Sequence, residues 1–135
     1  METRELDPLF DPSSLAIVGA SPDSWYSSRI TEHLTDYGYD GDLYLVNPNR
    51  ETAWDRRCYD AMSELPETVD LAVVVVPREH VVDVVREAGE VGVPAALVIT
   101  TGFSEADERG AQLEAELEAT AEEYAISVAG PNCIG

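Results

Sequence analysis

Lysine is absent from this chain, and basic residues of any kind are scarce. All eight basic residues are arginines, against 27 aspartates and glutamates, so the formal net charge of the 135 residues is −19. A surface this acidic repels nucleic acid and anionic membranes, which excludes both as expected partners. Repulsion among the carboxylates is strongest at low ionic strength, where screening is weak. We therefore expect a halophilic protein that works in a high-salt cytoplasm.

Cysteine is also scarce, and long apolar runs are missing. Cys58 and Cys133 stand far apart without CxxC spacing, so neither a zinc site nor a disulfide scaffold is expected. No apolar run approaches the roughly 18–20 residues that span a bilayer, and residues 1–10 are too acidic and polar for a secretory signal. A length of 135 residues with 44% hydrophobic residues suits one cytoplasmic domain with its own core.

Short apolar segments alternate with amphipathic ones along the chain. Strands are predicted at residues 15–18, 42–46, 71–76, 95–100 and 126–129. Helices are predicted at residues 28–38, 81–92 and 104–124, with Ser28 and Ser104 as N-caps and Gly38 and Gly92 near helix ends. This order predicts a doubly wound α/β fold, with about five parallel strands and helices on both faces. Ligands bind such sheets outside the carboxyl ends of the strands.

The first predicted strand leads through a serine-rich turn into a helix. A helix N-terminus favours phosphate, and hydroxyl groups add hydrogen-bond donors. The candidate phosphate ligands in this turn are Gly19, Ser21, Ser24, Ser27 and Ser28. The turn is not a GxGxxG loop, because no glycine follows Gly19 before Gly38, so the usual pyrophosphate site for NAD is not predicted. A plain strand–helix connection is the alternative.

Three arginines follow the second predicted strand within a few residues, at positions 50, 56 and 57. NAD-binding domains carry an acidic residue at the end of this strand to hold the ribose. Here the strand is followed by Asn47 and Pro48 instead. A guanidinium group suits a phosphate monoester, so the 2′-phosphate of NADP or the 3′-phosphate of CoA would both fit. Surface ion pairs with nearby carboxylates are the alternative.

Later turns add polar groups to the same predicted edge of the sheet. Pro77 precedes a helix whose first turn carries His80, for which a structural role is favoured over a catalytic one. Cys133 has no basic neighbour to activate it, so it is not assigned as a nucleophile. The other candidate contacts in these turns are Thr100, Thr101, Gly102 and Asn132.

Six segments, in the same order, resemble the N-terminal domain of NDP-forming acyl-CoA synthetases. That family includes the succinyl-CoA synthetase α subunit and the archaeal ADP-forming acetyl-CoA synthetases. The matching segments are residues 9–21 (LFDPSSLAIVGAS), 44–49 (YLVNPN), 58–59 (CY), 70–77 (DLAVVVVP), 101–103 (TGF) and 130–135 (GPNCIG). The resemblance implies that residues 1–135 form a CoA-binding, Rossmann-like domain of a longer multidomain protein.

The resemblance also implies where CoA would lie. Residues 21–28 would meet its phosphates, and Asn47, Pro48 and Arg50 would lie near the adenosine. Pro77 and residues 100–102 would line the path of the pantetheine arm, and the turn at residues 130–135, with Asn132, would lie close to the thiol. Relatives carry a lysine close to position 49. In this chain Arg50, or Arg56 and Arg57, would supply that charge.

The reaction implied for the whole protein joins a carboxylic acid to CoA at the expense of ATP or GTP. It would proceed through an acyl phosphate and a phosphohistidine, giving acyl-CoA, NDP and phosphate. Neither His33 nor His80 matches the phosphorylated histidine. We therefore expect no catalytic residue and no metal site here, with the nucleotide and magnesium bound by the remaining ligase domains or a β subunit. The family also implies assembly into homo-oligomers.

Three other functions are compatible with the residues. The first is a stand-alone CoA-binding regulatory module, and the second is an NADP-binding oxidoreductase domain, which the arginines allow and the missing GxGxxG loop opposes. The third is a protein-interaction domain without a ligand.

Overall fold

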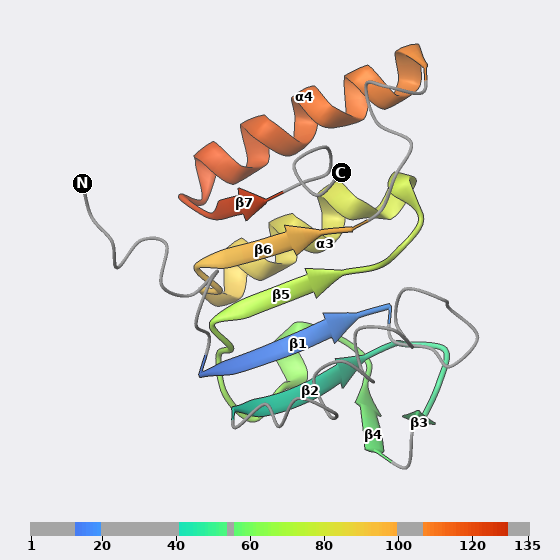
Figure 1. Cartoon of the computed structure of the whole chain (residues 1–135), viewed down its shortest axis with the longest axis vertical. Helices are drawn as coiled ribbons and strands as arrows, with labels where there is room; N and C mark the ends of the chain where they lie inside the picture. Colours follow the sequence, from blue (N-terminus) through green and yellow to red (C-terminus); the bar gives the residue numbers. More distant parts are fainter. Residues whose placement is uncertain (1–12, 20–40, 54–55, 100–106, 130–135) are drawn as a thin grey trace.

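The computed structural model of the chain describes residues 13–19, 41–53, 56–99 and 107–129, which form a seven-stranded sheet (Figure 1). The strands follow the order β3-β4-β2-β1-β5-β6-β7, and only β3 runs antiparallel to its neighbour. Their bounds are β1 Ser14–Val18, β2 Asp42–Val46, β3 Thr52–Ala53, β4 Arg56–Tyr59, β5 Leu71–Val74, β6 Ala95–Val98 and β7 Ser127–Ala129. The predicted α/β fold with a mostly parallel sheet is confirmed, and helices on both faces of the sheet stay a prediction.

The sequence pattern missed two of these strands. About five were predicted, and the described residues form seven, because β3 and β4 are short and carry polar residues at their exposed positions. Two further strands were predicted too long: the one expected over residues 71–76 ends at Val74, and the one over residues 95–100 ends at Val98. A continuous apolar run predicts burial correctly, but it does not show where pairing with the neighbouring strand stops.

Helix α3, Arg78–Val91, lies against one face of the central strands. Val81, Val82, Val85 and Ala88 are buried on its inner side, a spacing that fits a single helix face. The helix ends at Gly92, which adopts a left-handed φ of 90°. The predicted end of this helix is therefore confirmed, and a glycine there avoids the penalty that a Cβ would bring.

Helix α4, Glu108–Glu123, packs alongside α3 (Figure 1). Its N-cap is Asp107, whose side chain accepts a hydrogen bond of 2.7 Å from the Gly110 N–H. The prediction that Ser104 caps this helix was wrong, because the aspartate three residues later satisfies the first turn. Leu113 and Leu117 face the core. Gly89 of α3 allows the close approach, since a Cβ there would lie 2.5 Å from that of Tyr124.

The strands bury both of their faces. On the side of α3 and α4 the core includes Ala16, Val18, Val74, Val81 and Val98. On the opposite side the buried residues include Leu15, Ile17, Leu45, Leu71 and Val73. Both α-helices of the described ranges lie on the first side, and the helix predicted at residues 28–38 lies outside these ranges. No helix in the described part of the chain is long and apolar enough to cross a membrane.

Candidate functional site at the carboxyl edge of the sheet

The chain changes direction across the sheet at β1. From β1 it moves outward to β2, then returns to place β5 on the other side of β1 and continues to β6 and β7. β2 and β6 therefore lie on opposite sides of the β1–β5 pair, so the carboxyl ends of β1 and β5 form the switch point of the sheet. In open α/β sheets this switch point is where ligands bind.

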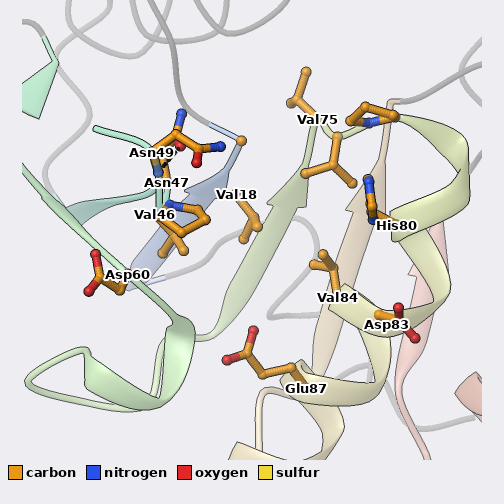
Figure 2. Close-up of a pocket in the computed structure, with 14 residues that line it drawn as sticks. Val18, Val46, Asn47, Asn49, Asp60, Val75, His80, Asp83, Val84 and Glu87 are labelled. Carbon is orange, nitrogen blue, oxygen red and sulfur yellow. Dashed lines mark hydrogen bonds between the residues drawn. The ribbon is translucent and has the colours of Figure 1, made fainter. Parts of the chain in front are cut away.

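A pocket of about 520 Å³ opens at this switch point (Figure 2). Its volume falls within the range of small-molecule sites. Most of its lining is apolar and comes from Val18, Gly19, Val46, Pro48, Val75, Val76, Pro77 and Val84. Its polar lining consists of Asn47, Asn49, Asp60, His80, Asp83 and Glu87. Four segments that are distant in sequence thus form one cavity.

Backbone hydrogen bonds hold this edge together one residue beyond the strands. At the ends of β1, β2, β4 and β5, the carbonyl oxygen of the last strand residue accepts a bond from the residue that follows a neighbouring strand. These bonds run from Gly19 to Val46 (2.8 Å), Val75 to Val18 (2.8 Å), Ile99 to Val74 (3.1 Å) and Asn47 to Tyr59 (2.9 Å). The edge beneath the pocket is therefore a continuous hydrogen-bonded support.

Gly19 occupies a position that only glycine fills without strain. Its φ is +94°, and a Cβ at this position would collide with the carbonyl oxygen of Val75. The colliding atom belongs to the backbone, so it cannot move away as the end of a flexible side chain could. The missing side chain also leaves the end of β1 open to the pocket, where the backbone can approach a ligand closely.

Asn47 shapes the turn that forms the opposite wall. Its Oδ1 accepts a hydrogen bond of 2.8 Å from the Asn49 N–H, and its carbonyl oxygen accepts one of 3.3 Å from the Arg50 N–H. This is the local bonding for which asparagine is favoured in turns. Asn47 therefore positions Pro48 and Asn49 at the pocket, whatever contact it makes with a ligand.

Helix α3 supplies the third wall with polar side chains at helical spacing. His80, Asp83 and Glu87 line the pocket together with Val84 (Figure 2). Burial raises the pKa of the Glu87 carboxyl, and hydrogen bonds from the backbone of Ser63 and Met62 partly oppose that shift. These bonds join α3 to the 3-10 helix η1, Met62–Glu64. The acidic wall favours hydrogen-bond donors over anions.

The structure brings together four of the predicted site residues. Gly19, Asn47, Pro48 and Pro77 all line the pocket, although they come from three separate turns. Arg50 is not part of the lining. The remaining predicted contacts lie outside the described residues, and they are Ser21, Ser24, Ser27, Ser28, Thr100, Thr101, Gly102 and Asn132.

The three clustered arginines belong to an arginine hairpin, the segment of residues 50–59 that contains β3 and β4. Arg50 Nε donates to the carbonyl oxygen of Thr52 at 3.5 Å. The guanidinium of Arg57 lies over the ring of Tyr59, 4.5 Å from its centroid, a favourable cation–π contact. Within the described ranges neither Arg56 nor Arg57 forms an ion pair with a carboxylate. The ion-pair alternative therefore does not describe these two side chains.

Sequence analysis did not assign the acidic wall of the pocket. Asp60 follows β4, a strand that the pattern missed, so its place at the edge could not be derived. Asp83 and Glu87 could have been found, because they share a face of the predicted helix with His80, at offsets of three and seven residues. No group of three or more metal-ligating side chains occurs in the parts of the chain that the structure covers.

Comparison with known proteins assigns the chain to a family. Residues 13–135 match the model of the CoA binding domain. The chain belongs to this CoA-binding family. It is 40% identical over 131 residues to the ADP-forming acetate–CoA ligase I of Archaeoglobus fulgidus. This alignment covers 96% of the chain and 19% of that ligase. It is 37% identical to the α subunit of the ADP-forming acetate–CoA ligase II of Pyrococcus furiosus, over 96% of the chain and 28% of that subunit.

A solved structure agrees with this CoA-binding assignment. The apo form of the dinucleotide forming acetyl-coenzyme A synthetase 1 of Ca. Korarchaeum cryptofilum superposes with a TM-score of 0.86 at 41% identity, covering 94% of this chain and 28% of that one. The expected Rossmann-like fold and the expected family are therefore confirmed. The chain spans between about a fifth and somewhat more than a quarter of the length of these relatives.

Proposed function

We propose that this domain binds CoA at the carboxyl edge of its sheet and serves as the CoA-binding domain of an NDP-forming acid–CoA ligase. One observation carries the proposal. The pocket at the switch point is lined by Gly19, Asn47, Pro48 and Pro77, the described members of the set that the family resemblance implies, Arg50 excepted. A CoA-binding family and a pocket at the position where such folds bind ligands support the same conclusion.

In this proposal each turn takes one part of CoA. Gly19 lets the ligand approach the end of β1, where Ser21, Ser24, Ser27 and Ser28 donate to the phosphates. Asn47 and Pro48 bound the adenosine, with Arg50 near the 3′-phosphate. Pro77, Thr100, Thr101 and Gly102 follow the pantetheine arm, and Asn132 lies toward the thiol.

The domain would present the thiol and leave the chemistry to other parts of the protein. The proposed overall reaction converts acid, CoA and ATP or GTP into acyl-CoA, NDP and phosphate through an acyl phosphate and a phosphohistidine. The nucleotide and its magnesium would bind in further ligase domains or in a β subunit, and homo-oligomers would form through them. No residue of this domain is assigned a catalytic role, so the chain alone should not turn over.

Calorimetric titration of the chain with CoA, and separately with NADP, tests the proposal. Binding of CoA without binding of NADP is the expected result. Binding of NADP alone would replace the proposal with an oxidoreductase domain. Silence with both ligands would leave a protein-interaction domain as the better function. The same titration does not separate a ligase domain from a stand-alone regulatory module. For that, the neighbouring domains are added, and formation of acyl-CoA would identify the ligase.

The titrations should be made in molar KCl. A net charge of −19 on 135 residues leaves strong self-repulsion at low salt, and the Debye length falls from about 10 Å at 0.1 M to about 3 Å at 1 M. We propose that the protein is adapted to a salt-rich cytoplasm. Its melting temperature should rise steadily with KCl, and a melting temperature that does not change with salt would contradict this adaptation.

A further inference from the structure

The inner end of the pocket is an apolar slot with a carboxylate at its base. Val18 and Val46 come from the ends of β1 and β2, and Val84 faces them from α3. Figure 2 shows the Glu87 side chain directed into the space between Val46 and Val84, with Asp60 on the far side of Val46. We refer to this part, bounded by Val18, Val46, Val84 and Glu87, as the valine slot.

The charges exclude phosphate from the valine slot. Asp60, Asp83 and Glu87 line this side of the pocket, and no arginine is among the lining residues that the structure describes. A phosphate group here would face carboxylates in a partly desolvated cleft, where like charges repel strongly. A flat apolar ring whose edge carries N–H donors suits the slot better than a phosphate does. The valines cover its faces, and a carboxylate accepts from its edge.

Glu87 is held in place for such a contact. Backbone groups of Met62 and Ser63 hydrogen-bond to its carboxyl, so its orientation is fixed from outside α3. A carboxylate has two oxygens and about four acceptor positions, which leaves capacity for a ligand donor. Asp83, one turn earlier on the same helix, is exposed and pairs with Arg86 at 3.4 Å.

We propose that Glu87 is a specificity-determining residue that accepts a hydrogen bond from the exocyclic amino group of the adenine ring of CoA, bound in the valine slot. The proposal rests on the proposed function, because it names the contact by which the same pocket would recognise its ligand. It assigns the phosphates to the Gly19 end of the pocket and the base to the Glu87 end.

The base itself provides the test. Replacing adenine by hypoxanthine exchanges the amino donor at C6 for a carbonyl acceptor and leaves the N–H donor of that ring edge on N1. A carboxylate placed against the C6 substituent then faces an acceptor to which it cannot hydrogen-bond. A CoA analogue with hypoxanthine should therefore bind about tenfold more weakly than CoA, since a hydrogen bond to a charged group is lost and an acceptor is left facing it. The variant Glu87→Gln should bind the two ligands with similar affinity, because an amide can donate as well as accept. Glu118→Gln, at an exposed position of α4 outside the pocket lining, is the matched control and should keep the tenfold preference.

Three outcomes separate the two proposals. Loss of the base preference in Glu87→Gln and its retention in Glu118→Gln would support the assignment. Equal binding of CoA and its hypoxanthine analogue by the unsubstituted protein would overturn the assignment while leaving CoA binding intact. Absence of CoA binding to the unsubstituted protein would overturn the proposed function, and the assignment of Glu87 with it.

A second measurement avoids any substitution, because Glu87→Gln also alters the bonds to η1. The carboxyl ¹³C resonance of Glu87 in the unsubstituted protein should shift when CoA is added and stay in place when phosphopantetheine, which has no base, is added. A resonance that moves equally with both ligands, or with neither, would overturn the assignment.

Discussion

The switch-point pocket lies at the centre of the sheet and the arginine hairpin at its β3–β4 edge, and the two are built in opposite ways. The pocket collects residues from the ends of β1, β2 and β5 and from α3, which lie far apart in the sequence. The hairpin gathers Arg50, Arg56 and Arg57 within one short segment, which is conspicuous, but none of the three lines the pocket. Residues that are neighbours in the sequence are therefore not the residues that meet at the site. In a parallel sheet, the residues that meet at the site are those at the carboxyl ends of adjacent strands.

Gly19→Ala should break the pocket side of this comparison and have the largest effect. The new Cβ would collide with the Val75 carbonyl oxygen at a φ of +94°, so we expect a loss of about 3 kcal/mol in the free energy of unfolding from strain and overpacking together. Equilibrium unfolding in urea measures this loss of stability.

Gly92→Ala is the matched control for that substitution. Gly92 has a similar φ of +90°, but a Cβ there would meet only Thr68 Cγ2 at 3.9 Å. It should cost about 1 kcal/mol, the backbone penalty alone. Equal losses in the two variants would show that contact with Val75 does not decide the Gly19 position.

The double variant Arg50→Ala, Arg56→Ala tests whether the hairpin charge reaches a ligand in the pocket. If these guanidinium groups contact the 3′-phosphate, affinity for CoA should fall about tenfold, while affinity for dephospho-CoA stays nearly constant. Parallel calorimetric titrations measure the difference. Arg109→Ala, which removes an exposed arginine of α4 paired with Glu116 at 3.7 Å, should change neither affinity. Equal losses for both ligands would remove the hairpin from phosphate recognition.

Arg78 offers a contrast with the hairpin, because it follows the pocket residue Pro77 and is already paired. Its two terminal nitrogens donate to the two Asp107 oxygens at 2.8 and 3.2 Å. Hydrogen bonds from Arg78 and from the Gly110 backbone lower the pKa of Asp107 below its ordinary value of 3.8. A carboxyl with a lowered pKa stabilises the fold above the unfolded-state value, and this contribution is lost as the pH falls through the folded-state value.

Asp107→Asn should therefore lower the melting temperature modestly at pH 7 and less at pH 3. Asparagine caps a helix about as well as aspartate, so the substitution removes the charge and keeps the cap. The exposed pair is screened by salt, so the effect should shrink further in molar KCl. A difference in melting temperature that is the same at pH 7 and pH 3 would contradict the role of the charge.

The substitution with the smallest expected effect is Arg50→Ala, read out on Cys58, the thiol of the arginine hairpin. The residue is 6% exposed, and burial raises its pKa, while the nearby charge of Arg50 lowers it. In a Cys133→Ser background the remaining thiol should react with a thiol reagent more slowly than in denaturant, by about tenfold or more. Arg50→Ala should slow the reaction slightly further. Faster reaction in that variant would show that Arg50 restrains the hairpin rather than tuning its thiol.

The sequence predicted the parts of this molecule that rest on apolar continuity. Residues 42–46 were assigned correctly as a strand, the helix end at Gly92 was correct, and Gly19, Asn47, Pro48 and Pro77 were placed at one edge because parallel strands end together. The same reasoning failed at β3 and β4. Arginines occupy the exposed positions of β4, and β3 is defined only by its pairing with β4. The same reasoning also missed Asp60, which follows β4, and it left Glu87 unassigned although that residue shares a helix face with His80.

The hydrogen-bonded support beneath the pocket has a consequence for the energetics of recognition. Residues that would otherwise be the first loop positions, such as Gly19, Asn47 and Val75, have their amide groups bonded to neighbouring strands. These positions are ordered before any ligand arrives, so that part of the site loses little conformational entropy on association. The entropic cost of binding would then fall on the ligand and on the longer connections, and the lengths of those connections could vary between proteins without disturbing the support.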